Sequence, residues 1–194
     1  MLGCMARWAP DTRERLRVAA LELFEERGFG ATTVPDIVER TGVTRRTFFR
    51  HFSDKREVFF GDDEIPALAT ATLAAAPAGA SPFSIAWTGL HALAAERFEP
   101  RRDQMAASRR IIAAEPALRE RDLQKQADLR EAIRAGCVSR GSDPLTARVV
   151  AGVTVDLLQT ALERWLADES RMPLTRHLDE ARQRMSDILG DLPA

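Results

Sequence analysis

The chain has 194 residues, of which 45% are hydrophobic and 29% are charged, a balance typical of a globular protein and not of a disordered one. Its 28 Lys and Arg side chains are nearly matched by 29 Asp and Glu, so the chain as a whole is not a polycation. The two cysteines, Cys4 and Cys137, fit no metal-binding or redox spacing, and we expect reduced thiols in a cytoplasmic protein with no metal and no cofactor.

Apolar residues recur at helical spacing almost everywhere, and no stretch shows strand-like alternation. We therefore expect an all-α protein of about nine helices, four in an N-terminal part and five in the rest. The first is predicted over 11–27 and ends at Gly28. Thr33 is a capping residue for a second helix, and Gly42 marks a tight turn before Thr44, which caps a third helix that runs to Phe52.

The remaining helices are separated by Pro, Gly and Ser. They are predicted over 54–76, 81–98, 101–114, 116–139, 143–168 and 173–190. Residues 65–95 carry no charged side chain apart from His91, but Pro66, Pro77 and Pro82 interrupt them, so we predict no membrane span there. The expected domains are residues 1–60 and 61–194.

The segment from Thr33 to Phe52 has the parts of a helix-turn-helix. Two short capped helices and a glycine turn can bury a shared apolar seam, formed by Ile37, Val38, Val43, Phe48 and Phe52. The third helix would then present Thr and Arg side chains outward, and these are donors suited to phosphates and to the edges of bases.

Residues 28–55, which read GFGATTVPDIVERTGVTRRTFFRHFSDK, resemble the N-terminal domain of TetR-family transcriptional regulators. The resemblance covers about residues 11–60. It implies a three-helix helix-turn-helix domain followed by a larger helical domain for ligand binding and dimerisation. Carried over by position, it makes these residues the DNA-facing set: Thr33, Thr44, Arg45, Arg46, Thr47, Phe49, His51 and Lys55.

Two details of this set lead to specific expectations. The family usually has Tyr where this chain has Phe49, so the hydroxyl that would reach a phosphate is missing here. Arg45 and Arg46 lie about 100° apart on a helix, so we expect one to read a base and the other to contact a phosphate. Lys55 is expected to contact phosphate and to contribute to the salt dependence of binding.

Helix-turn-helix proteins usually bind DNA as two-fold dimers, and the last two predicted helices offer apolar stripes for pairing. The alternative is that the stripes only build the core of the monomer, whereas the resemblance favours a four-helix interface between two chains. The candidate interface residues are Leu157, Leu158, Ala161, Leu162, Trp165, Leu174, Leu178, Ala181, Met185 and Ile188.

The resemblance also implies a pocket for a small-molecule effector. The uncharged helix at 81–95 and its neighbours supply apolar residues with a few polar groups, as ligand sites usually do, although each such residue alone is more often part of the core. The candidates are Trp87, Thr88, His91, Phe98, Met105 and Arg109. An effector that prefers the conformation with misplaced DNA helices would weaken DNA binding, and the helix at 54–76 is the expected lever.

The sequence therefore favours a ligand-responsive repressor of a palindromic operator, with double-stranded DNA, a second copy of itself and an unidentified effector as partners. An enzyme is not expected, because the three histidines have no catalytic or metal-ligand context. The alternative is a dimeric helical ligand-binding or interaction protein without operator binding.

Overall fold

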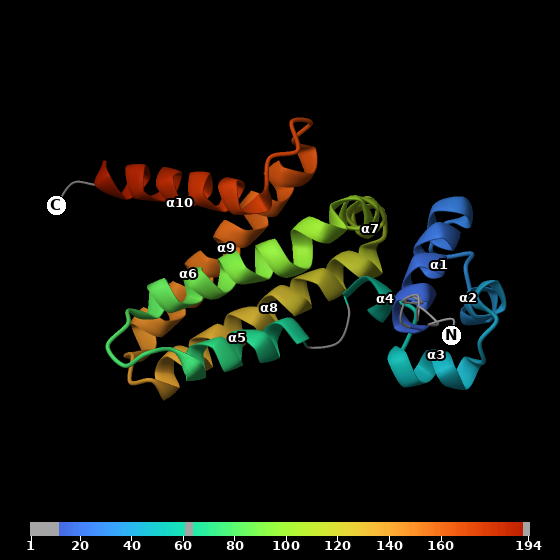
Figure 1. The fold of residues 1–194 in the computed structure, drawn as a ribbon, viewed down its shortest axis with the longest axis horizontal. Coiled ribbons are helices and arrows are strands. Elements are labelled where there is room, and N and C mark those ends of the chain that lie inside the picture. The colour runs from blue at the N-terminus through green and yellow to red at the C-terminus, as the bar shows by residue number, and fades with distance from the viewer. Residues whose placement is uncertain (1–11, 61–63, 192–194) are drawn as a thin grey trace, which may run out of the picture. The chain divides into compact units, whose positions relative to one another are not determined.

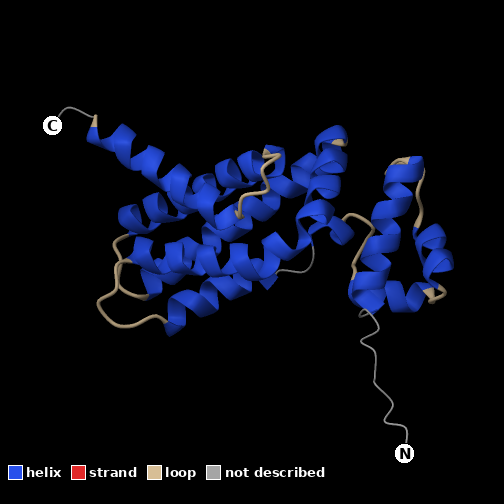
Figure 2. Cartoon of the chain, turned by 45° about the horizontal axis from the view of Figure 1, so that its top comes forward, coloured by secondary structure: helices blue, strands red, loops and turns tan. Residues whose placement is uncertain are grey.

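The computed structural model describes residues 12–60 and 64–191, and within these ranges the chain forms only helices and connecting segments (Figure 2). The all-α prediction is confirmed for this part of the chain. Ten α-helices are present in it, and eight of them have at least eight residues. In chain order they are α1 (Thr12–Arg27), α2 (Val34–Thr41), α3 (Arg45–His51), α4 (Glu57–Phe60), α5 (Glu64–Ala75), α6 (Pro82–Leu93), α7 (Arg102–Ala114), α8 (Pro116–Ser139), α9 (Pro144–Ala167) and α10 (Leu174–Gly190) (Figure 1).

The N-terminal helix boundaries follow from capping residues that the sequence identifies. The Thr33 backbone N–H donates to the Asp36 carboxylate, and the Asp36 N–H donates back to the Thr33 hydroxyl, so the capping box at the start of α2 is complete. Gly42 ends α2 with φ at 69°, a left-handed conformation that costs glycine little. These interactions form within a few residues of one another, which is why the sequence predicts them well.

The helix predicted over 54–76 corresponds to two described helices, α4 and α5, on either side of residues 61–63, which lie outside the described residues. Asp54 does cap the first piece, since its Oδ1 accepts the backbone N–H groups of Arg56 and Glu57. This piece, α4, ends at Phe60, and α5 begins again at Glu64. Pro66 lies in the first turn of α5 as it is described, where its missing N–H is tolerated.

The helix predicted over 81–98 also changes character before its expected end. α6 stops at Leu93, and a π-helical segment, Ala94–Phe98, and a 3-10 segment, Glu99–Arg101, lead into α7. Pro100 lies in the 3-10 segment, where the lack of an N–H donor is less costly than inside an α-helix. The chain therefore continues as one helical path between two helices that the sequence predicts as separate.

The described residues divide into two compact units, each with its own core. The first unit contains residues 12–60 together with 107–119, and the second contains 64–106 and 120–191. Ile112 and Leu118 are buried in the first core beside Phe24 and Val58. The chain thus passes from one unit to the other within α7 and returns within α8, a connection that the linear division at residue 60 does not contain.

Helix α9 is the most apolar of the long helices. Its 24 residues are long and apolar enough to cross a bilayer by length and composition, but half of its apolar window is buried inside the protein. This is the pattern of a core helix. Among the described residues, no group of three or more His, Cys, Asp and Glu side chains is placed to hold a metal ion.

Candidate functional site

The helix-turn-helix seam forms in the first unit as the sequence predicts. Ile37, Val38, Phe48 and Phe52 are buried in its core, and Val43 packs against that core from the turn. The Phe48 and Phe52 ring centroids lie 5.4 Å apart. These contacts fix the inner side of α3 and therefore determine which of its side chains face outward.

The outer side of α3 is basic, and its arginines have no ion-pair partner within the part of the chain that the structure describes. Arg45, Arg46 and Arg50 are exposed, and the residues that the structure describes give none of them a hydrogen bond or ion pair. Arg40 on α2 contrasts with them, because it donates to both carboxylate oxygens of Glu26. No acidic residue lies between Glu39 and Asp54, so the positive charge of α3 is locally uncompensated.

Phe49 lies on the same side of α3, with 54% of its surface exposed. An exposed phenylalanine beside unpaired guanidinium groups is typical of a surface that is covered by a partner. Thr44 and Thr47 lie at the start of this side. The Thr44 hydroxyl accepts the Thr47 backbone N–H and lies 3.0 Å from the Thr47 hydroxyl.

Thr33 is exposed at the start of α2, and its hydroxyl donates to Asp36 at 2.6 Å. This bond, together with that from the Thr33 backbone, holds the pKa of Asp36 below its usual value. His51 is half-buried at the end of α3, and its Nε2 has no hydrogen-bond partner among the described residues.

Lys55 is placed differently from its sequence prediction. Its Nζ donates to the backbone carbonyls of Phe29 at 2.7 Å and Thr32 at 2.9 Å, and it lies 4.2 Å from the centroid of the Phe29 ring. Burial lowers the pKa of Lys55, and the nearby charge of Glu115 partly offsets this. The ammonium therefore fastens the segment between α1 and α2, with two of its three donors directed inward.

Thr32 takes part in the same fastening and is missed by sequence reasoning. It is fully buried, and its hydroxyl makes contacts with the carbonyls of Leu23 at 3.1 Å and Gly28 at 2.9 Å. The adjacent threonines Thr32 and Thr33 are a weak sequence signal of this buried role, because only one of the two can cap α2. The other has to find a different partner.

The six predicted ligand residues have different surroundings, and their assignment to an effector site stays a prediction. In the second unit, the ring centroids of Trp87 and His91 lie 4.8 Å apart in a tilted arrangement, and Phe98 and Met105 pack against the core. The Thr88 hydroxyl donates to the Ser84 carbonyl, and His91 lies 3.2 Å from Asp179. Arg109 belongs to the first unit. Helical spacing predicts that such residues face inward, but it does not predict which residues each of them contacts.

An apolar cavity does exist in the second unit, among α5, α6, α8 and α9. None of the six predicted residues lines it. Its lining includes Leu73, Leu90 and Ile133, and its polar side chains are Thr72 and Thr154. Thr154 occupies a position of the buried stripe Val150, Thr154 and Leu158, and a lone polar residue on an apolar stripe is the signal by which the sequence could have pointed to it.

Seven of the ten predicted dimer residues are buried within the single chain, and the assignment of the interface stays a prediction. The exceptions are Ala181 and Met185, which are half-buried, and Ile188, which is 65% exposed. The stripes of α9 and α10 pack against each other and against α6 in one core, so they serve the monomer. The buried residues are Leu157, Leu158, Ala161, Leu162, Trp165, Leu174 and Leu178.

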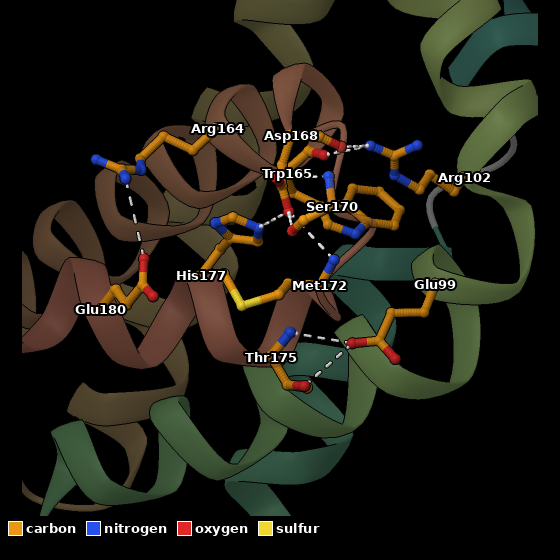
Figure 3. A network of polar contacts seen from close by, with 10 residues as sticks. All are labelled: Glu99, Arg102, Arg164, Trp165, Asp168, Ser170, Met172, Thr175, His177 and Glu180. Atoms are coloured by element: carbon orange, nitrogen blue, oxygen red, sulfur yellow. Dashed lines mark hydrogen bonds and ion pairs between the residues drawn. The ribbon is translucent and has the colours of Figure 1, made fainter.

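The connection between α9 and α10 is held by a polar network (Figure 3). The Asp168 carboxylate accepts the Ser170 hydroxyl and backbone N–H and the Met172 backbone N–H, and it lies 3.3 Å from Nε2 of the buried His177. Arg102 donates to the carbonyls of Trp165 and Asp168. The hydrogen bonds to Asp168, that of Ser170 foremost, lower the pKa of its carboxyl to about 2.

This lowered pKa predicts an acid-sensitive contribution to stability. Because the folded-state pKa lies below that of the unfolded chain, the contribution is complete above about pH 4 and is lost as pH falls toward about 2. Asp168→Asn should lower the urea midpoint at neutral pH, and its difference from the unchanged protein should shrink across that interval. Denaturation curves measured at several pH values check this. Asp103→Asn, at an exposed carboxylate, is the control, and a constant difference at all pH values would contradict the assignment.

Two family models match the chain. The model described as bacterial regulatory proteins, tetR family, matches residues 16–61, and the one described as MftR C-terminal domain matches residues 90–190, which is more than half of the chain. The regulator TcmR of Streptomyces glaucescens is 47% identical over 83 residues, which are 41% of this chain and 36% of TcmR. The repressor BepR of Brucella suis is 41% identical over 51 residues, 26% of this chain and 24% of BepR. The matched segments thus span about a third or less of these relatives.

Among solved structures, FadR of Thermus thermophilus, a TetR-family transcriptional repressor in complex with lauroyl-CoA, is similar in fold. Its TM-score is 0.52 at 22% identity, with 94% of this chain and 96% of that chain covered. The two family models together account for both the helix-turn-helix and most of the second unit. The chain therefore belongs to the TetR family of bacterial regulatory proteins, which are transcriptional regulators and not enzymes.

Proposed function

We propose that this protein is a ligand-responsive repressor that binds a palindromic operator as a homodimer in the bacterial cytoplasm. The observation that carries the proposal is the outer side of α3, where three arginines with no partner among the described residues surround an exposed phenylalanine. Guanidinium groups hydrogen-bond both to phosphates and to the O6 and N7 atoms of guanine. Residues 1–60 are the proposed DNA-binding domain, with contacts from Thr33, Thr44, Arg45, Arg46, Thr47, Phe49 and His51.

Residues 61–194 are the proposed ligand-binding and dimerisation domain. One α3 helix reads too few base pairs to be specific, and two-fold dimers solve this by reading two half-sites. We assign the interface to the outer sides of α9 and α10, because the core residues of these helices are already packed. Leu145 and Val149 on α9, and Ile188 and Leu189 on α10, are apolar residues with more than half of their surface exposed, as interfaces require.

The effector is proposed to act by linkage. A ligand that binds the second unit better in the conformation unsuited to DNA weakens operator binding by the same coupling free energy, typically about 1–3 kcal/mol. The route for this coupling is the chain itself, which passes between the units within α7 and α8, and not only through the segment before α5. FadR, which has a similar fold, is in complex with lauroyl-CoA, and this supports the ligand response.

Selection of bound duplexes from random DNA by the purified protein tests the proposal. We expect enrichment of a palindrome whose half-sites lie about one helical turn apart, and a complex whose mass corresponds to DNA with at least two chains. A reporter gene with this palindrome at its promoter should be expressed more strongly when the regulator is deleted. If the folded protein binds no duplex even at low salt, it is instead a helical ligand-binding protein without operator binding.

A further inference from the structure

The cavity of the second unit has a lining without charge. Thirteen residues from α5, α6, α8 and α9 surround it, and eleven of them have purely hydrocarbon side chains or are glycine. The remaining two are Thr72 and Thr154. The space inside it that is open to small molecules is about 40 Å³, where a single water needs about 10–15 Å³, so the site suits only a small ligand.

The Thr154 hydroxyl is the exceptional group in this lining. The residue is 3% exposed, and its Oγ1 has no hydrogen-bond partner among the described residues. Three other helical threonines, Thr41, Thr70 and Thr88, each donate to the carbonyl four residues earlier. A buried hydroxyl without a partner is costly, and such groups usually have a specific explanation.

A second feature is the close approach of α5 and α6 beside the cavity. Gly89 lines the cavity, and a methyl group added there would lie 2.9 Å from Cγ2 of Thr72. The β-branched Thr72 has little freedom to move away from it. The glycine therefore allows this close approach, while the cavity extends beside it.

We propose that Thr154 is the specificity-determining polar group of an effector site for small uncharged molecules. These molecules are largely hydrocarbon or aromatic and carry one carbonyl oxygen, which accepts a hydrogen bond from the Thr154 hydroxyl. The inference rests on the proposed ligand response and names the class of ligand. A bound carbonyl supplies the acceptor that the protein does not provide. The rest of such a molecule matches the apolar lining, as in most small-molecule sites.

The same lining selects against charged ligands. A carboxylate moved into an apolar cavity loses its hydration and needs a cation or several donors in exchange. No Lys, Arg or His lines this cavity, and one hydroxyl is not sufficient compensation. An anionic group would have to remain in water at the mouth, and the site therefore distinguishes a ketone, ester or amide from the corresponding acid.

Three probes of nearly equal shape separate the carbonyl from the charge. Acetophenone has the carbonyl oxygen, and α-methylstyrene has a CH₂ group in its place. Benzoate carries the negative charge. Calorimetric titration of the full chain should detect acetophenone but not benzoate. Thr154→Val removes the hydroxyl at almost constant volume and should weaken acetophenone about 3- to 10-fold. The same change should leave α-methylstyrene unweakened. Thr154→Ser should keep the acetophenone affinity, and Thr160→Val, the same chemical change at an exposed position of α9, is the matched control.

The inference would be overturned if Thr154→Val changed the affinities for acetophenone and α-methylstyrene equally. It would also be overturned if benzoate bound as tightly as acetophenone, or if neither neutral probe bound. Thermal unfolding of the variant, expected at or above the temperature of the unchanged protein, shows that it is folded. Binding is measured without DNA, so a failure here leaves operator binding untouched. Probes that bind as expected but leave operator affinity unchanged would instead refute the proposed ligand response.

Discussion

Replacing Arg45 and Arg46 together with Ala is expected to lower operator affinity about 100-fold or more, because a good bidentate base contact contributes about 1–3 kcal/mol and a phosphate contact adds counterion release. Neither side chain has a hydrogen bond or ion pair among the described residues, and both are exposed. Stability should therefore change by no more than about 0.5 kcal/mol. Fluorescence anisotropy on the selected operator and on scrambled DNA, over a range of salt concentrations, measures both effects.

The single variants separate the two roles. The variant that loses the base contact should bind operator and scrambled DNA with similar affinity. The other should weaken both DNAs alike and reduce the slope of log affinity against log salt by about 1. Arg134→Ala removes the same charge from a surface arginine of α8 that pairs with Glu131, and it is the control for net charge. A double variant that binds the operator like the unchanged protein would remove α3 as the recognition helix.

The accuracy of sequence reasoning in this protein follows the range of the interactions involved. The capping box of Thr33, the left-handed Gly42 and the seam residue Phe48 depend on neighbours within about two helical turns, and the structure has each as predicted. The start of α9 at an Asp143 cap belongs to the same class. Such local signals predict where α2, α3 and α9 begin, whereas the helices predicted over 54–76 and 81–98 differ from those in the structure.

Predictions that concern partners far away in the sequence are harder to make, because a periodic pattern in one segment does not identify the partner. The apolar stripe through Leu174 and Leu178 shows that one side of α10 is buried, but the same spacing fits a second chain or the chain's own α9. The structure has the second arrangement. The cavity beside Thr154 depends on residues of four helices, and no periodicity in one segment encodes which gaps remain between them.

Lys55→Met is expected to lower the free energy of unfolding of the first unit by about 2 kcal/mol. Hydrogen bonds to charged groups contribute about 1.5–3 kcal/mol each, and Lys55 donates two of them, to Phe29 and Thr32. The sum is reduced here because the side chain is only half-buried and water can replace part of the interaction. Methionine keeps the apolar stem over the Phe29 ring and removes the charge. Urea denaturation followed by circular dichroism measures the change, with Lys125→Met at the other lysine as the control.

The same variant decides between the inward placement of Lys55 and the phosphate contact that the sequence predicts. If the ammonium serves mainly to fasten the segment between α1 and α2, Lys55→Met should lose stability while the protein that remains folded keeps its salt slope on operator DNA. If Lys55 neutralises a phosphate, the slope should fall by about 1 and stability should change little. A loss of slope without a loss of stability would therefore contradict the inward role, because two partly buried carbonyls would lose a cationic donor.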